Sequence, residues 1–305
     1  MNLSLKNKKP EISTADRKKQ SVAKSSVWAA FGLVAMKAVV GILTGSLGIL
    51  AEALHSGLDL VAALVTWFAV RISSKPADRE HLYGHGKYEN ISALFETLLL
   101  LITCLWIIHA AIMRLVGKEV DVIVNAWSFL VMAISIIVDI SRSRMLFKAA
   151  KKYNSQALEA DALHFSTDIW SSAVVIFGLL CVAVGDWFPN LVFLRYADAV
   201  GAIVVGLIVI EVSWKLGVRT IRALLDTAPS GLEEQIIRVA EEVPGVINCH
   251  HVRLRAAGAQ IFVDMHVLMD GGKSLRDAHR LTEEIERAIR VISPDADVTV
   301  HPEPK

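Results

Sequence analysis

Six long apolar stretches dominate the N-terminal two thirds of the chain. They cover approximately residues 26–46, 49–72, 91–116, 122–146, 157–185 and 197–217. A helix needs about 20 apolar residues to cross a bilayer, and each stretch has that length. The pattern therefore predicts an all-α transmembrane bundle of six helices.

After residue 222 the continuous apolar stretches give way to the alternating apolar and polar residues of a soluble domain. Ser230, followed by Glu233 and Glu234, is typical of a capped helix start, and Pro244-Gly245 should end that helix. Ser274 should open a second helix. The expected elements are a helix over 230–243, strands over 247–255 and 260–268, a helix over 274–292 and a strand over 297–301. This order predicts a small α+β domain with its helices on one face of a sheet.

Composition supports a membrane protein of two domains. Of the 305 residues, 53% are hydrophobic, and the mean hydropathy of +0.46 is high for a soluble domain. The N-terminal segment lacks the pattern of a cleaved signal peptide, so the first apolar stretch should remain. We expect an N-terminal arm over 1–25, a transmembrane domain over 26–217 and a separate soluble domain over 218–305.

Basic residues predict the orientation of the chain. The net charge is only +1, so nucleic acid is not an expected partner. The lysines and arginines gather in the N-terminal arm and after the second, fourth and sixth spans: Arg71, Lys75, Arg79, Lys87, Arg142, Arg144, Lys148, Lys151, Lys152, Lys215, Arg219 and Arg222. The positive-inside rule then predicts a multi-pass protein of the cell membrane with both termini in the cytoplasm.

The three cysteines do not indicate a cysteine-based site. Cys104, Cys181 and Cys249 are far apart and have no CxxC spacing. Neither a disulfide framework nor a cysteine zinc knuckle is therefore expected. Cys104 and Cys181 are interpreted as buried apolar thiols.

Two matched octets carry acids and histidines into the second and fifth spans. Residues 52–59 and 161–168 each show an acid, a histidine three positions later and an aspartate four positions after that. Such spacing places the three side chains on one helix face. The octets contain Glu52, His55, Asp59, Asp161, His164 and Asp168. Ionisable residues in a span are costly and indicate function, although each acid could instead pair with a histidine or lysine inside the bundle.

The inner pairs of the two octets are candidate ligands for one ion. His55, Asp59, His164 and Asp168 should all lie near the middle of the membrane, because the two spans run in opposite directions. Two imidazole nitrogens and two carboxylate oxygens suit tetrahedral Zn²⁺, whereas Mg²⁺ and Ca²⁺ prefer more oxygen ligands. The leading acids should lie about one turn toward opposite faces and are candidate pathway residues.

Two further groups of histidines lie outside the apolar stretches. Asp78, His81 and His85, in the connection after the second span, are spaced for one metal, although histidines and aspartates are common in loops. The terminal domain contains His250, His251, His266, His279, His301 and Glu303. The elements could bring these together, or they could be unrelated surface residues. Cys249 is an additional possible ligand, and Lys37 in the first span should snorkel or pair with an acid.

In combination and order, these motifs resemble the cation diffusion facilitator (CDF) family of proton-coupled exporters of divalent transition metals. The resemblance covers nearly the whole chain and rests on Gly45-Ser46-Leu47, Glu52-x-x-His55-x-x-x-Asp59, Pro76-Ala77-Asp78, Gly84-His85-Gly86-Lys87-x-Glu89, Asp161-x-x-His164-x-x-x-Asp168 and Leu225-Asp226. It implies a homodimer of six-span subunits with a cytoplasmic domain of ferredoxin-like, metallochaperone-like fold at the dimer interface.

The resemblance also implies roles for particular residues. It assigns transport to His55, Asp59, His164 and Asp168, a loop site to Asp78, His81 and His85, and a terminal binuclear site to His250, His266, His279, His301 and Glu303. Some members have aspartate at the position of His55, and histidine there looks like the zinc-selective arrangement. Glu303 and His251 stand where similar proteins have aspartate. No histidine occurs over 141–156, so members with a histidine-rich loop there are not matched.

The sequence therefore predicts a secondary transporter that exports Zn²⁺ from the cytoplasm in exchange for protons. Cd²⁺, Co²⁺ and Fe²⁺ are other possible cargoes, and Zn²⁺ is also expected as a regulatory ligand of the terminal domain. A membrane di-metal enzyme is an alternative, because Glu-x-x-His occurs in helical di-iron sites. A zinc protease would need histidine where Ala51 stands. A membrane-anchored metal sensor without transport is the third alternative.

Overall fold

The computed structural model describes residues 13–116, 126–187 and 197–305. The chain divides into two compact units, Met1–Val218 and Arg219–Lys305. Each unit is described by itself below.

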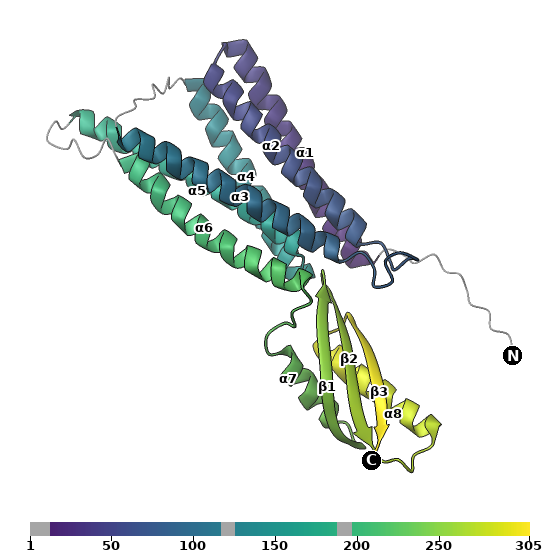
Figure 1. Ribbon diagram of the computed structural model, residues 1–305. Helices are drawn as coiled ribbons and strands as arrows, with labels where there is room; N and C mark the ends of the chain where they lie inside the picture. Colours follow the sequence, from purple (N-terminus) through teal and green to yellow (C-terminus); the bar gives the residue numbers. More distant parts are fainter. Residues whose placement is uncertain (1–12, 117–125, 188–196) are drawn as a thin grey trace. The chain divides into compact units, whose positions relative to one another are not determined.

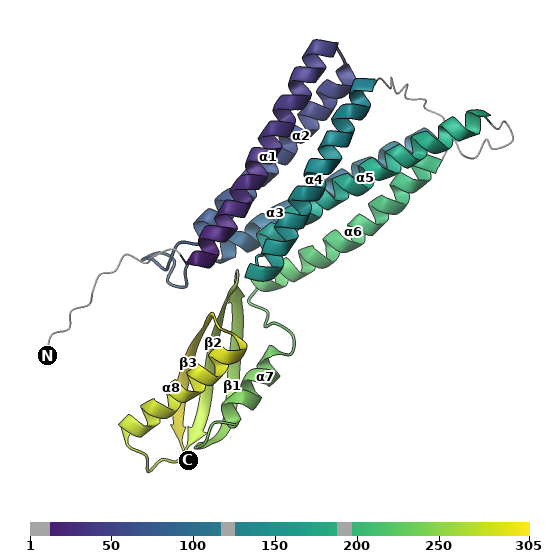
Figure 2. The same ribbon diagram turned by 180° about the vertical axis from the view of Figure 1, so that it is seen from behind.

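The first unit is built from long helices, drawn from two sides in Figures 1 and 2. Within the described ranges these are α1 (Thr14–Thr44), α2 (Leu47–Ser73), α3 (Lys87–Leu115), α4 (Ala126–Tyr153), α5 (Gln156–Trp187) and α6 (Ala197–Leu224). Among the described residues, α1, α2, α3 and α6 are long and apolar enough to cross a membrane. Helices α4 and α5 are not among these four, so a count of six spans stays a prediction.

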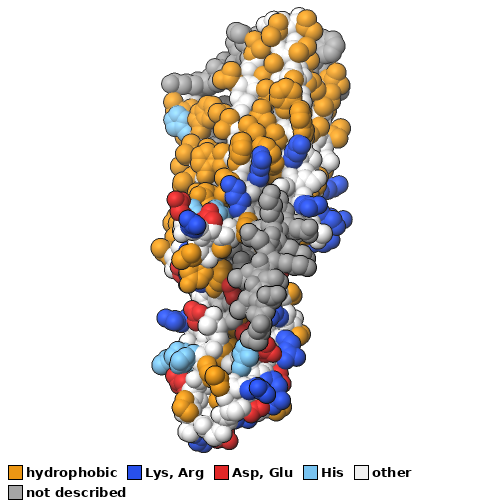
Figure 3. All heavy atoms as spheres, turned by 90° about the vertical axis from the view of Figure 1, so that its right-hand side faces the viewer, with side chains coloured by type: hydrophobic (Ala, Val, Ile, Leu, Met, Phe, Trp, Pro, Cys, Tyr) orange, Lys and Arg blue, Asp and Glu red, His pale blue; other side chains and the backbone are white. Residues whose placement is uncertain are grey.

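Large apolar side chains face outward on the helical unit, as expected of helices surrounded by lipid. Leu54 is 78% exposed and Trp106 is 70% exposed. Figure 3 shows hydrophobic side chains gathered over the helices on the face that it draws. Polar residues are buried instead, among them Glu89, Glu96 and Asp161, each at most 1% exposed. The unit is therefore apolar outside and partly polar inside.

Tight turns and small residues position the helices. Gly45 ends α1 in the left-handed conformation at φ 65°, and Ser46 caps α2 by accepting a hydrogen bond from the Ile49 N–H. The Gly45-Ser46-Leu47 motif is thus the connection of the α1–α2 pair. Helix α6 approaches α3 closely at Gly206, where an added Cβ would lie 2.7 Å from Ile108 Cγ1.

The second unit has the predicted order of elements. It contains α7 (Leu232–Glu241), β1 (Val246–Ala257), β2 (Gln260–Met269), α8 (Leu275–Ile292) and β3 (Ala296–Pro304). The sheet order is β1-β2-β3, with β1 antiparallel and β3 parallel to β2. Both helices cover one face (Figures 1 and 2), where Ile236 of α7 and Ile285 of α8 pack with Val263 and Met265 of β2. The prediction of an α+β domain is confirmed.

The ends of these elements differ from the prediction in two places. The predicted Ser230 cap is wrong: α7 begins after Gly231, which has φ 76°, and the helix start has no side-chain cap. The strands are longer than expected, because the β1–β2 turn needs only Gly258 and Ala259. The Ser274 start is confirmed, since its hydroxyl accepts a hydrogen bond from the Asp277 N–H.

Candidate metal sites

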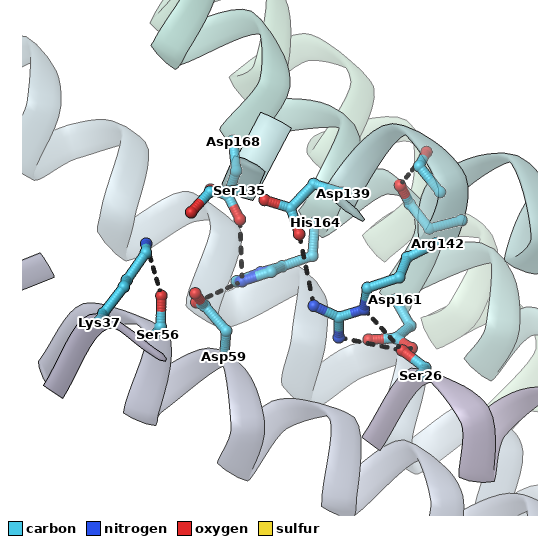
Figure 4. Close-up of polar contacts among 12 residues, drawn as sticks. Ser26, Lys37, Ser56, Asp59, Ser135, Asp139, Arg142, Asp161, His164 and Asp168 are labelled. Atoms are coloured by element: carbon cyan, nitrogen blue, oxygen red, sulfur yellow. Dashed lines mark hydrogen bonds and ion pairs between the residues drawn. The ribbon is translucent and has the colours of Figure 1, made fainter. Parts of the chain in front are cut away.

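Helices α2 and α5 bring the inner pairs of the two octets to one place. One ligand atom from each of His55, Asp59 and Asp168 lies within 4.8 Å of the others. His164 Nε2 lies 3.0 Å from Asp59 Oδ1 and 3.8 Å from Asp168 Oδ2. Figure 4 shows His164 between these two carboxylates. A spacing of four residues on each helix suffices for this, because it keeps the two side chains on the same face.

The central cluster combines buried and accessible donors. Asp59 is 8% exposed and His164 is 5% exposed, whereas His55 and Asp168 are half-buried. Four donors within this space can surround one ion at the bond lengths of about 2.0 to 2.2 Å that zinc requires. A partly open site is chemically suited to an ion that must enter and leave.

The leading acids of the two octets have different surroundings. The Glu52 side chain is 59% exposed, and its Oε2 lies 3.1 Å from Lys37 Nζ. This contact confirms that Lys37 pairs with an acid. Lys37 also donates to Ser56 Oγ at 2.8 Å. Asp161 is completely buried and accepts a hydrogen bond from Ser26 Oγ at 3.3 Å. Neither acid belongs to the cluster of donors.

Arg142 is buried within a helix, whereas its place in the sequence suggested an exposed connection. It belongs to α4 and is 3% exposed. Nη1 lies 3.4 Å from Asp139 Oδ1 and Nη2 donates to Ser26 Oγ at 3.0 Å, while the guanidinium carbon lies 3.5 Å from the centre of the Phe165 ring. Figure 4 shows this guanidinium beside Asp161. A buried cation inside the bundle was therefore missed.

Two further acids are buried inside the bundle. Glu96 on α3 and Asp139 on α4 are also enclosed, with Glu96 at 0% exposure and the Asp139 side chain at 15%. Both fall inside predicted spans, so an acid within an apolar run was the signal that could have found them. Whether these acids face the interior or the lipid depends on how the helices pack, which the sequence pattern does not show.

The connection between α2 and α3 folds around Asp78. Its Oδ1 accepts hydrogen bonds from the backbone N–H groups of Glu80 at 3.0 Å and His81 at 2.7 Å. His85 Nε2 lies 3.4 Å from Asp78 Oδ2, and the His81 and His85 rings are 4.4 Å apart between centres. Gly84, at φ 77°, allows the turn between them. These three side chains form a second group of possible ligands.

Hydrogen bonding also sets the charge of Asp78. The His81 N–H lowers the pKa of this carboxyl, with the Glu80 N–H contributing in the same direction. Because the folded-state pKa is lowered, these bonds stabilise the loop above the unfolded pKa and are lost as pH falls through the folded one. Asp78 is therefore available as an ionised ligand at neutral pH.

The strand histidines of the second unit lie side by side across the sheet. His250 of β1 pairs with His266 of β2, which pairs with His301 of β3. They occupy the face opposite the helices, since the neighbouring Met265 and Val267 enter the core. Glu303 reaches this face too, with Oε1 2.8 Å from His266 Nδ1 and Oε2 3.1 Å from His250 Nε2. The His266 bond is the main cause of the lowered pKa of Glu303.

An irregularity in β1 adds a further histidine. The pairing with β2 shifts between His250 and Arg253, and His251 has φ 49°. A bulge of this kind lets two consecutive side chains serve one face. The ring centre of His251 thus lies 5.3 Å from that of His266. Two overlapping groups result: His250, His251 and His266, and His266, His301 and Glu303.

Two residues considered for this site lie elsewhere in the protomer. His279 is on α8, its side chain is 72% exposed, and Nε2 lies 3.6 Å from Glu283 Oε1. Cys249 points into the core and is 5% exposed, and burial raises the pKa of its thiol to about 11. A thiol that stays protonated is a poor metal ligand. Cys104 is buried as expected. The side chain of Cys181 is not among those that the structure describes.

Comparison with known proteins identifies the class. Residues 23–225 match the family model "Cation efflux transmembrane domain", and residues 228–305 match "Cation efflux protein, cytoplasmic domain". The chain belongs to the cation efflux family, also called the cation diffusion facilitators. It is therefore a membrane transporter of metal cations and not an enzyme, so the di-metal enzyme and protease alternatives are excluded.

Two cation-efflux pumps agree with this assignment. The cation-efflux pump FieF of Yersinia enterocolitica (serotype O:8 / biotype 1B) is 31% identical over 264 residues, which span 86% of this chain and 84% of the relative. FieF of Yersinia pestis (strain Pestoides F) is 32% identical over 264 residues, which again span 86% of this chain and 84% of the relative. The C-terminal domain of MamM, solved in a nickel form, is 26% identical over 25% of this chain and 99% of its own, with a TM-score of 0.24. The model matched by residues 228–305 bears the name ZT_dimer, which indicates dimerisation.

Proposed function

We propose that this transporter carries Zn²⁺ out of the cytoplasm in exchange for protons. The observation that carries the proposal is the meeting of His55, Asp59, His164 and Asp168 between α2 and α5. Two neutral imidazoles and two carboxylates suit tetrahedral zinc. Cd²⁺, Co²⁺ and Fe²⁺ can use some of the same donors, so the proposal concerns preference among divalent ions.

Proton exchange follows from the donors themselves. Histidine must be neutral and aspartate ionised to bind the ion, so metal and protons compete for the same atoms. Opening of the site to the more acidic side protonates the ligands and releases Zn²⁺. Opening to the cytoplasm lets the ligands deprotonate and bind again. Because one site alternates between the two sides, each transported ion is exchanged for protons.

The two leading acids are proposed to serve opposite sides of this pathway. Glu52 is the outer residue, which its exposure and its Lys37 contact support. Asp161 is the inner residue, one turn from His164, beside Arg142. Neutralising Glu52 would then slow release outside, and neutralising Asp161 would slow access from the cytoplasm.

The remaining parts fit a dimeric membrane protein. We propose six spans over 26–217 in the cell membrane, with the arm 1–25 and the domain 218–305 in the cytoplasm and the latter at a homodimer interface. The Asp78, His81 and His85 group would hold metal at the cytoplasmic side. Zn²⁺ bound by the strand histidines and Glu303 would regulate transport by favouring one conformational state, which requires a higher affinity for that state.

Zinc flux into proteoliposomes tests the transport proposal. With the purified chain in vesicles of acidic interior, Zn²⁺ uptake should grow with the pH difference and collapse when an ionophore removes that difference. Competition with Cd²⁺, Co²⁺ and Fe²⁺ ranks the cargoes. Absence of pH-driven flux of all four ions, with zinc still bound by the protein, would favour the metal-sensor alternative.

Metal binding by the strand histidines is tested separately. In the full-length protein, the double variant His266→Ala with His301→Ala should bind fewer Zn²⁺ ions per chain than the wild type, because both strand groups need His266, while the central and loop sites keep their donors. The matched control is His279→Ala, on the exposed side of α8. Equilibrium dialysis with Zn²⁺ measures the stoichiometry. Retention of all zinc by the double variant, or equal loss in the control, would contradict the assignment.

A further inference from the structure

The imidazole of His164 presents its two nitrogens to different helices. Nε2 faces the carboxylates of Asp59 on α2 and Asp168 on its own helix, at 3.0 and 3.8 Å. Nδ1 instead faces α3, where Oε2 of Glu96 lies 3.9 Å away. His164 is 5% exposed and Glu96 is 0% exposed, so bulk water does not reach this contact.

The two facing atoms lie too far apart to form a hydrogen bond with each other. Within the described residues, neither His164 Nδ1 nor Glu96 Oε2 makes a hydrogen bond. The other oxygen of Glu96 accepts a hydrogen bond from Thr66 Oγ1 at 3.2 Å, which anchors the carboxylate to α2. A buried polar atom without a hydrogen bond is destabilising. Their separation exceeds a charge-assisted hydrogen bond by about 1 Å, so a small shift would join them.

Metal binding changes which nitrogen carries the proton. With Asp59 ionised, its carboxylate can only accept, so the 3.0 Å contact then requires the proton of His164 on Nε2. An ion at the central site needs the bare Nε2. A neutral imidazole keeps one proton, which must then be on Nδ1. That N–H is buried and requires an acceptor.

We propose that Glu96 is a positioning residue that accepts the Nδ1–H of His164 when the central site holds its ion. The inference rests on the proposed function of the central site. Glu96 does not bind the ion in this scheme. It fixes the ring and tautomer that aim Nε2 at the ion and makes that nitrogen a better donor, as carboxylates behind metal-bound histidines do. A third helix, α3, thereby takes part in ion selection.

Glu96→Leu and Glu96→Gln test this role. Loss of an outer partner of a metal-bound histidine typically costs 10- to 100-fold in affinity. We expect Glu96→Leu to raise the half-saturating Zn²⁺ concentration for flux by about that factor, with a much smaller change in maximal rate. Glu96→Gln keeps a neutral acceptor and should show a smaller rise, because neutral hydrogen bonds are about half as strong.

Glu89→Gln provides the matched control. Glu89 is on the same helix, is 1% exposed and is hydrogen-bonded to Lys19 and Ser73, so it reports the general effect of neutralising a buried acid. This control should keep the wild-type half-saturating concentration. Elution volume and unfolding temperature establish that each variant is folded. If Glu96→Leu does not fold, the isosteric Glu96→Gln carries the test.

Three results would overturn the inference: wild-type half-saturation in the folded Glu96 variants, an equal shift in Glu89→Gln, or loss of maximal rate with unchanged half-saturation. Failure of the proposed function looks different. In that case the wild-type protein itself would show no saturable Zn²⁺ flux, whatever stands at position 96.

Discussion

Zinc flux is expected to fall more than about 100-fold when Asp168 is replaced by asparagine or His55 by alanine. Each change removes a direct donor from a set of four, which should exceed the 10- to 100-fold effect typical of an outer-shell partner. The remaining donors cannot complete a tetrahedral site for zinc. Initial rates of pH-driven Zn²⁺ uptake into proteoliposomes measure the loss.

His109→Ala is the matched control for this experiment. His109 lies on α3, is exposed and lies outside the three histidine groups. Its replacement should leave zinc flux within about twofold of wild type, because exposed substitutions away from specific features have small effects. Wild-type flux in Asp168→Asn or His55→Ala, at equal protein density in the vesicles, would refute the assignment of the central site.

Arg142→Met is expected to be the most destabilising single substitution among the basic residues discussed above. Removal of one partner from a buried ionic network costs about 3 to 5 kcal/mol, because the opposite charges stay buried without compensation. Here Asp139 and Asp161 would lose their neighbouring guanidinium. The unfolding temperature of the purified protein in detergent should fall accordingly.

Two further variants show whether charge is the cause. Arg144→Met removes an exposed cation two residues later and should change stability by no more than about 0.5 kcal/mol. Adding Asp139→Asn to Arg142→Met should recover part of the lost stability, since it removes one uncompensated acid. Equal unfolding temperatures for Arg142→Met and Arg144→Met would show that the guanidinium does not stabilise the bundle.

Local spacing explains why the central cluster was predictable. His55 with Asp59, and His164 with Asp168, are separated by one helical turn, so each pair faces one way once a helix forms. To match the two pairs, it was enough to estimate how deep each pair lies in the membrane. Whether these residues bind zinc stays a prediction, because geometry alone does not distinguish zinc from other divalent ions.

Burial of the other ionisable residues was less accessible to sequence reasoning. Arg142 was assigned to a basic connection because Arg144 and Lys148 follow it, yet α4 turns it inward while Arg144 stays exposed. Glu96 was overlooked in the same way. An apolar run does not reveal which face of a helix meets its neighbours, since lipid and protein interiors favour similar side chains.

The strand histidines of the terminal domain are brought together by the pairing register of the sheet. The order of helices and strands along the chain was predicted correctly, but the alignment of His250, His266 and His301 in one row depends on strand pairing that the sequence does not display. His279 lies on the helical side in the same unit. The bulge at His251 follows from neither hydrophobic alternation nor turn chemistry.

That bulge has a consequence for how many ions one protomer can hold. The two three-donor groups share His266, and a neutral imidazole has only one unprotonated nitrogen that can bind a metal ion. We expect an ion bound by His301, His266 and Oε1 of Glu303 to leave His250 and His251, together with Oε2 of Glu303, which lies 3.1 Å from His250 Nε2. A second ion in the same protomer would then share Glu303 and complete its coordination with water or with side chains of a neighbouring subunit.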